Sequence, residues 1–355
     1  MNFDLDDEQI LVRDAIDRLF DTQAAAETHD LATEWRAYQD LGLIALPFSA
    51  EQGGLDGSRE TIMLLMESYG RTLAQAPYLQ SVLLAGRILA RTGHPALGDL
   101  LDGGLHAVLC LHEPGMRYRW DIPATQAVRT DAGWTLRGAK VAVLDADSAD
   151  LILCPATTAE GLAIFLVPAA TPGLSVQIHP TPDGRRAANL TFDVMLPHDA
   201  AIGDPAMLGE AVDGGIVACC AEAVGAMERL VSLSADYLNT RHQFGVPLSC
   251  FQALQHRAAD MLVAVEQARS MTFYAVSMLD APPAQRQVAV AASKALVNRA
   301  ARFVGSEAIQ LHGGMGLAAE YPAGRYFQRL TVLETMLGDT DHLLEQVEAG
   351  PPLPS

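Results

Sequence analysis

The sequence predicts an α+β protein with more than one domain: an N-terminal helical domain, a middle β-barrel or sandwich domain and a C-terminal helical bundle. Two patterns favour this order. Apolar residues recur with a helical period toward both ends of the chain, whereas short β-like runs separated by Gly, Pro and Asp fill its middle. The length of 355 residues also exceeds that of an ordinary single domain.

The N-terminal domain is expected over residues 1–104. Acidic residues at positions 6–8 suit the positively polarised end of a first helix, and a glycine-rich turn follows at 52–57. Helical periods of apolar residues occur over 10–20, 62–73 and 82–89. The sequence therefore predicts helices on both sides of the turn.

The middle domain is expected over residues 105–208. Six short runs there have the composition of strands: 107–111, 125–129, 134–143, 151–154, 162–167 and 188–195. Several short strands at this spacing predict a small barrel or sandwich.

The C-terminal helical bundle is expected over residues 209–350. One helical pattern leads to Arg241 and is interrupted at Gly245 and Pro247. Two longer helical patterns follow, over 248–279 and 283–312. The Pro-rich tail, residues 351–355, is expected to be disordered.

Charge and cysteine usage exclude several classes of function. The net charge of −19 disfavours nucleic acid and anionic membranes as partners. The five cysteines are odd in number and show no CxxC spacing, so neither a disulfide framework nor a zinc site is expected, and the scattered histidines indicate no other metal site. The chain begins without an apolar leader and has no run long enough to span a bilayer, which favours a cytoplasmic location.

Two segments in the C-terminal part carry residues suited to a dinucleotide. The first is Thr-Arg-His-Gln-Phe-Gly over 240–245. If this segment is helical, Arg241 and Phe244 share a face. A guanidinium can hold a pyrophosphate through paired hydrogen bonds, and an aromatic ring can pack on the dinucleotide. The alternative is an ordinary arginine at a helix end beside a buried phenylalanine.

The second segment is Gln-Leu-His-Gly-Gly-Met-Gly over 310–316. Gln310 can offer an amide to a ribose or phosphate, and Gly313 and Gly314 have no Cβ, so a ligand can approach their backbone closely. The alternative is a glycine helix cap without a ligand. His312 and His256 lie in or beside these segments and could make polar contacts to the same ligand.

Together, these two segments resemble the C-terminal helical domain of acyl-CoA dehydrogenases, and the resemblance extends over nearly the whole chain. It includes Glu-Tyr-Pro at 320–322. The resemblance implies the acyl-CoA dehydrogenase fold, FAD as cofactor, an acyl-CoA substrate and an electron acceptor similar to electron-transfer flavoprotein. It also implies that one set of residues reaches across a subunit interface to a neighbour's FAD: Arg241, Gln243, Phe244, Gln310, Gly313 and Gly314.

The family's catalytic base has no counterpart at its usual place. A glutamate abstracts the α-proton of the thioester while the β-hydrogen leaves as hydride to the flavin, and in many members it lies in a loop after the last long helix. Counting from Gln310, that position falls on Leu337, or on Gly338 if one residue is inserted. Asp339 is adjacent, but its side chain is shorter and is displaced along the chain.

A second subset of the family places the glutamate on the first helix of the C-terminal domain. Aligned through Tyr237, that position falls on Gly215, and the following position, often an arginine, is Ile216. Asp213 is nearby in sequence, but two residues along a helix place it on a different face. The resemblance therefore assigns no catalytic residue to this chain.

The flavin-holding parts of the middle domain also depart from the family. The Glu-Pro-Gly of the family's flavin loop is present at 113–115, but His112 precedes it and the bulky residues 116–119 replace small polar ones. The later segment that covers the flavin ring reads Val-Leu-Asp at 143–145, and Asp145 beside a reduced flavin would be unfavourable.

Residues that hold FAD within one subunit are thus lost, while those that reach a neighbour's FAD are retained. This pattern favours a hetero-oligomer in which a related catalytic subunit supplies the base. The stretches 70–74 and 76–79 resemble the bacterial branch that acts on steroid side-chain CoA thioesters as α2β2 assemblies. Two alternatives remain: a self-sufficient homo-oligomeric dehydrogenase with an atypical base such as Asp339, and a binding or scaffold protein that has lost flavin.

Overall fold

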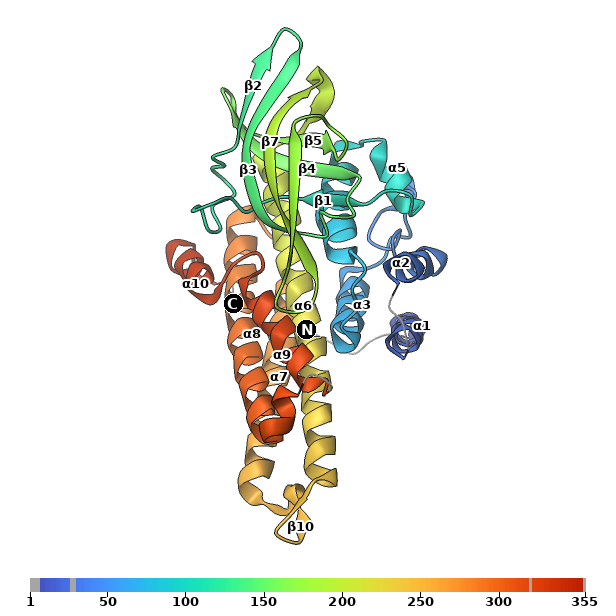
Figure 1. Ribbon diagram of the computed structural model, residues 1–355, viewed down its shortest axis with the longest axis vertical. Helices are drawn as coiled ribbons and strands as arrows, with labels where there is room; N and C mark the ends of the chain where they lie inside the picture. The colour runs from blue at the N-terminus through green and yellow to red at the C-terminus, as the bar shows by residue number, and fades with distance from the viewer. Residues whose placement is uncertain (1–6, 26–29, 319–320, 354–355) are drawn as a thin grey trace. The chain divides into compact units, whose positions relative to one another are not determined.

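The computed structural model describes residues 7–25, 30–318 and 321–353, coloured along the chain in Figure 1. The chain divides into two compact units. The helical unit contains residues 1–29, 59–74 and 216–355, and the β-containing unit contains residues 30–58 and 75–215. Each compact unit combines segments that are far apart in the sequence, so this division does not test the domain boundaries predicted at residues 104 and 208. Those boundaries stay predictions.

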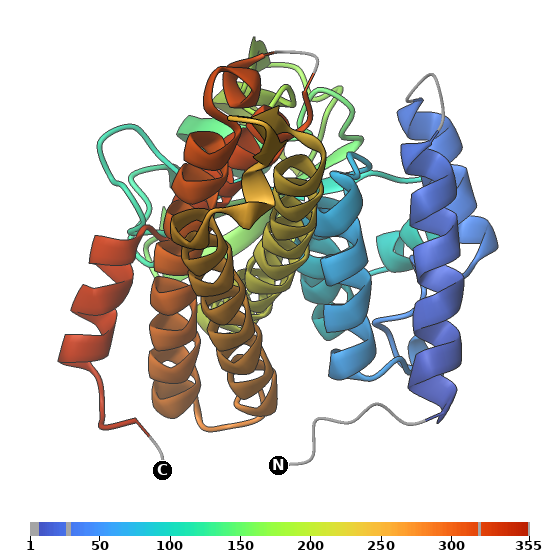
Figure 2. The ribbon, with the colours of Figure 1, turned by 90° about the horizontal axis from the view of Figure 1, so that it is seen from below.

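The helical unit is built from long helices, which lie side by side in Figures 1 and 2. Its helices are α1 (Asp7–Ala24), α3 (Arg59–Thr72), the C-terminal part of α6 (Pro205–Thr240), α7 (Gln252–Ser277), α8 (Pro283–His312), α9 (Ala323–Thr335) and α10 (Thr340–Ala349). Helix α8 packs against α7, α9 and α10, and α1 packs against α3. The bundle therefore places the ends of α6 and α8, which carry the predicted ligand segments, within one unit.

Helices α3 and α6 approach each other closely through two glycines. A Cβ added to Gly70 would lie 1.9 Å from the carbonyl oxygen of Glu222, and one added to Gly225 would lie 1.8 Å from that of Glu67. Glycine is required at both positions because any side chain would collide with the facing backbone. Gly70 belongs to the stretch 70–74, which resembles the bacterial branch that acts on steroid side-chain CoA thioesters. The packing of α3 on α6 therefore accounts for one residue of that resemblance.

The β-containing unit holds an eight-stranded mixed sheet together with α2 (Leu31–Asp40), α4 (Arg87–Thr92), α5 (Ala96–Leu101) and a π-helical segment (Tyr78–Gly86). The strands are β1 (Ala107–Leu109), β2 (Gln126–Thr130), β3 (Gly133–Leu144), β4 (Leu151–Thr158), β5 (Gly161–Pro168), β6 (Leu174–Pro180), β7 (Arg186–Leu196) and β8 (Ala201–Gly203). Their order is β6-β7-β3-β2-β4-β5-β8, and β1 pairs in parallel with β4.

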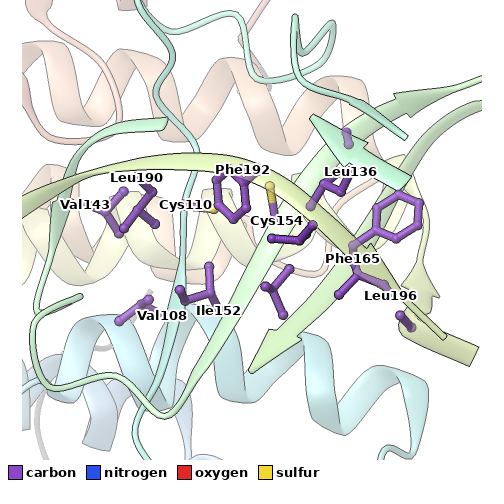
Figure 3. Close-up of a cluster of buried hydrophobic side chains, with 14 of the residues drawn as sticks. Val108, Cys110, Leu136, Val143, Ile152, Cys154, Phe165, Leu190, Phe192 and Leu196 are labelled. Carbon is purple, nitrogen blue, oxygen red and sulfur yellow. The ribbon is translucent and has the colours of Figure 1, made fainter. Parts of the chain in front are cut away.

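One cluster of buried apolar side chains forms the core of this sheet (Figure 3). Most of its members come from β1, β2, β3, β4, β5 and β7, and the rings of Trp134 and Phe165 meet edge to face at 5.2 Å. A charged pair is also buried in this unit: Lys140 Nζ lies 2.8 Å from Glu113 Oε1, with side-chain exposures of 0% and 2%. Such a pair persists only because each charge compensates the other.

The fold predicted from the sequence is confirmed: helices, then a small β domain, then helices, as in acyl-CoA dehydrogenases. The two helices predicted over 248–279 and 283–312 are present. The first begins at Gln252, because residues 248–250 form a 3₁₀ turn. Strands β6 and β8 were not predicted. Asp6, Glu320 and residues 354–355, which entered the predictions above, lie outside the described residues.

Candidate FAD-reaching site

The first predicted segment is a β-hairpin, so the expectation that Arg241 and Phe244 share a helix face is wrong. Helix α6 ends at Thr240, and His242–Gln243 pairs antiparallel with Val246–Pro247. The two loop residues, Phe244 and Gly245, have φ of 53° and 82°. Positive φ at both positions is the geometry of a type I′ hairpin, which cannot continue a helix.

The hairpin presents its side chains to solvent. Phe244 is 91% exposed, and Arg241 and Gln243 are also exposed. The backbone is nonetheless fixed: the Arg241 N–H donates to the Tyr237 carbonyl at 2.8 Å, and the Leu248 N–H donates to the Arg241 carbonyl at 2.8 Å. An ordered backbone that carries an exposed guanidinium and an exposed aromatic ring suits contact with a large ligand or partner.

The second predicted segment ends α8. Gly313 caps the helix with φ of 57°, and Gln310, Gly313 and Gly314 are exposed. Among the described residues, no atom beyond the chain neighbours lies within 4 Å of the position that a Cβ would take at either glycine, so the space above this backbone is open. The main chain of the turn is therefore accessible, and the contact of a ligand with it stays a prediction.

His312 and two tyrosines connect the two segments. The His312 ring lies 4.6 Å from that of Tyr237 on α6 and 4.8 Å from that of Tyr321. His312 is only 2% exposed, so it does not face the open space, and the predicted polar contact of His312 with a ligand is not available to it. His256, by contrast, is exposed on the first turns of α7.

The loop where the family's base would lie joins α9 to α10. Leu337 is 4% exposed with φ of 56°, and Gly338 has φ of 131°. Asp339 is the N-cap of α10, and its carboxylate accepts a hydrogen bond of 2.9 Å from the His342 N–H. The one carboxylate in this loop is thus committed to capping a helix.

A fully buried lysine fixes the start of the same loop. Lys294 Nζ lies 2.9 Å from both the Asn298 side-chain oxygen and the Leu333 carbonyl, and 3.5 Å from the Glu334 carbonyl. Burial lowers the pKa of Lys294, while Cys219, Cys220, Glu334 and Asp339 act in the opposite direction. These contacts satisfy carbonyls at the C-terminal end of α9, which the helix itself leaves unpaired.

The alternative base position lies within α6. Gly215, Ile216 and Asp213 are all buried there. Asp213 and Gly215 are two positions apart, so their side chains leave the helix about 200° apart. Asp213 therefore does not occupy the direction of the alternative base.

The family's flavin loop in the β-containing unit is filled by this chain's own side chains. The His112 ring meets that of Tyr118 at 5.6 Å, and Tyr118 meets Trp120 at 6.4 Å. Glu113 accepts hydrogen bonds from the Ala124 and Thr125 N–H groups at 2.5 and 3.1 Å in addition to its pair with Lys140. Neither a small polar cradle nor a free carboxylate is present in this loop.

Asp145 directly follows β3 in a left-handed conformation, with φ of 61°, next to the buried side chains of Val143 and Leu144. Its carbonyl accepts a hydrogen bond of 3.2 Å from the Ser148 N–H, so the residue opens a tight turn. A turn at this place accounts for Asp145 without reference to a ligand.

Three family models match the chain in order. The N-terminal, middle and C-terminal domains of acyl-CoA dehydrogenases match residues 6–99, 109–195 and 208–350. The human mitochondrial short-chain specific acyl-CoA dehydrogenase is 30% identical over 331 residues, which cover 87% of this chain and 80% of that protein. These matches and the fold define a three-domain oxidoreductase of the kind that acts on CH–CH groups.

Two solved structures of paired chains are also similar. A chain of the ChsE4–ChsE5 complex from Mycobacterium tuberculosis has a TM-score of 0.90 with 25% identity, covering 98% of both chains. A variant of the Tcur3481–Tcur3483 steroid ACAD has a TM-score of 0.88 with 29% identity, covering 96% of both chains. The chain belongs to the acyl-CoA dehydrogenase family, whose cofactor is FAD. Across the described residues, no helix has both the length and the apolar character of a membrane span.

Proposed function

We propose that this chain is a subunit of a heteromeric FAD-dependent acyl-CoA dehydrogenase, in which it completes the FAD site of a related catalytic subunit and contributes no base. The observation that carries the proposal is a contrast between two parts of the chain. The segments around Arg241 and Gly313 are ordered and exposed, whereas the positions of the base hold Leu337, Gly338 and Gly215.

The exposed segments fit one side of FAD. Arg241 can pair with a phosphate, Phe244 offers an apolar face of ring size, and Gly313 and Gly314 leave their backbone open to a close approach. Gln243 and Gln310 add amides that can donate to ribose or phosphate oxygens. FAD, when bound, accepts the hydride; these residues would hold and orient the cofactor without taking a proton.

The chain's own flavin loop does not fit the cofactor. Tyr118 lies where the family has small residues and packs edge to face with His112 and Trp120, and Glu113 is held by Lys140. A second subunit would therefore have to provide the bed for the flavin ring. The solved ChsE4–ChsE5 complex and the paired Tcur chains make a related partner subunit a reasonable model.

The substrate class we propose is an acyl-CoA thioester, with a steroid side-chain CoA as the first compound to test because the Tcur pair is described as a steroid ACAD. The electron acceptor would be similar to electron-transfer flavoprotein. The alternative of a self-sufficient enzyme with Asp339 as base is less favoured, since the Asp339 carboxylate caps α10.

The first experiment counts flavin. The chain is expressed alone and together with the candidate partner, and FAD is measured per subunit by absorbance after denaturation. The chain alone should hold little FAD. It should also aggregate, because apolar side chains that the partner subunit would cover are then exposed to water. Tightly bound, stoichiometric FAD in the isolated chain would overturn the heteromeric proposal.

The second experiment tests the base in the complex. Asp339→Asn keeps the helix cap, and Asp213→Asn keeps the volume of a buried side chain, so both variants should retain turnover within a few-fold of the parent. The glutamate of the partner, changed to Gln, should abolish acceptor reduction with the CoA thioester. If Asp339→Asn removes activity while FAD stays bound and the complex stays assembled, this chain carries its own active site.

A further inference from the structure

We propose that His312 is a positioning residue that sets the distance between the two FAD-reaching segments by joining Tyr237 and Tyr321 in one cluster of aromatic rings, the ring cluster. This inference rests on the proposed function, since it concerns the same cofactor site. It assigns to His312 a role other than touching the ligand, which its burial prevents.

The ring geometry places His312 between the two tyrosines. Its ring is 4.6 Å from that of Tyr237, at 35° between the planes, and 4.8 Å from that of Tyr321, at 50°. The two tyrosine rings are themselves 6.1 Å apart at 66°. The three rings lie close enough to pack on one another, and the hydrogen bonds of His312 set their relative positions.

Both nitrogens of His312 have a partner. Nδ1 lies 2.8 Å from the Ala308 carbonyl, and Nε2 lies 3.0 Å from the Tyr321 hydroxyl. A carbonyl only accepts, so Nδ1 carries the proton, and Nε2 accepts from Tyr321. Burial, the largest cause, raises the pKa of Tyr321, so its hydroxyl keeps the proton that it donates.

Two members of the ring cluster are attached directly to the FAD-reaching segments. The Tyr237 carbonyl accepts the Arg241 N–H at 2.8 Å, at the point where α6 gives way to the hairpin. His312 is followed at once by Gly313, the residue that turns the chain out of α8 with φ of 57°. A shift of His312 would therefore move the glycine turn relative to the hairpin.

The outer sides of both segments are open. Among the described residues, no atom beyond the chain neighbours lies within 4 Å of the missing Cβ positions at Gly313 and Gly314, and the hairpin tip at Gly245 is equally open. The ring cluster contacts the two segments on their inner sides.

The test measures FAD affinity of the assembled complex by flavin fluorescence, together with hydrogen exchange at residues 313–317. His312→Phe keeps a ring but loses both hydrogen bonds, so FAD affinity should fall about tenfold, the effect of one or two ordinary hydrogen bonds. Exchange at 313–317 should accelerate. His312→Gln cannot stack but can donate to the Ala308 carbonyl and accept from Tyr321, so affinity should return to within about threefold of the parent.

Tyr321→Phe provides a second variant in case His312→Phe does not fold, and it should weaken FAD binding by a smaller factor. His179→Phe, on strand β6, is the control and should change neither affinity nor exchange. Unchanged affinity in His312→Phe, or a loss that His312→Gln reproduces in full, would overturn the positioning role. Unchanged affinity in Arg241→Ala and Phe244→Asn would instead overturn the proposed function, so the two failures are distinguishable.

Discussion

Substitution of Phe244 separates the contact with FAD from the stability of the fold. The side chain is 91% exposed in this chain. Full burial of a phenylalanine side chain contributes about 1.5–3 kcal/mol. If Phe244 packs on the cofactor of the complex, its removal should weaken FAD binding about ten- to a hundredfold.

The same substitution should leave the folded chain intact. In the described structure Phe244 makes one ring contact, an edge-to-face approach to Phe251 at 6.2 Å, and its backbone has φ of 53°. Asparagine followed by glycine is the preferred sequence for a type I′ hairpin. Phe244→Asn should therefore preserve or improve the turn while removing the aromatic face.

The assay is equilibrium titration of FAD into the flavin-free complex, with thermal unfolding of the same samples. Val128→Ala serves as the control, because Val128 is 59% exposed on β2, away from both segments in sequence. The reasoning is refuted if Phe244→Asn binds FAD as the parent does, or if its Tm falls together with its affinity.

Three further substitutions test the stability of the chain within the complex. Burial raises the pKa of Glu67 to about 7 from 4.5, so its contribution to stability is present below pH 4.5 and lost as pH rises through 7. The parent should therefore lose up to about 3 kcal/mol of stability between pH 5 and pH 8, whereas the urea midpoint of Glu67→Gln should change little over that range. Lys140→Met leaves the buried Glu113 carboxylate without its counter-charge and should cost about 3–5 kcal/mol in urea unfolding, of which Glu113→Gln in the same chain should restore part. Asp339→Ala removes the cap of α10 and should cost about 1 kcal/mol, whereas Asp339→Asn should be nearly neutral in the same measurement.

Proline and glycine at the ends of a helix made some elements predictable from the sequence. Helix α8 runs over Pro283–His312, the range expected, because a proline at its start and Gly313 at its end both favour those limits. Strand β6 alternates apolar and polar residues over Leu174–His179, so its sequence carried the period of a strand, and the prediction overlooked that signal.

The hairpin could not be predicted because Phe244 is an unusual residue for its conformation. A positive φ is uncommon outside glycine, asparagine and aspartate, so Phe-Gly gives no clear turn signal. The candidate residues were still the right kind to examine, since Arg241, Gln310, Gly313 and Gly314 are all exposed. The internal role of His312 required the structure, because a motif does not reveal which of its side chains is buried.

The backbone between α9 and α10 disfavours a base in this loop through its geometry as well as through its residue types. The side chain at Leu337 is packed away from solvent, so a carboxylate there would be buried without a partner. Gly338 has φ of 131°, which side chains rarely adopt, and a Cβ there would lie 3.0 Å from Leu343. Asp339 caps α10, and Lys294 holds the preceding carbonyls. A single substitution would therefore not restore a base in this loop; the backbone itself would have to change, and that constraint favours a role for this chain in holding the cofactor of another subunit.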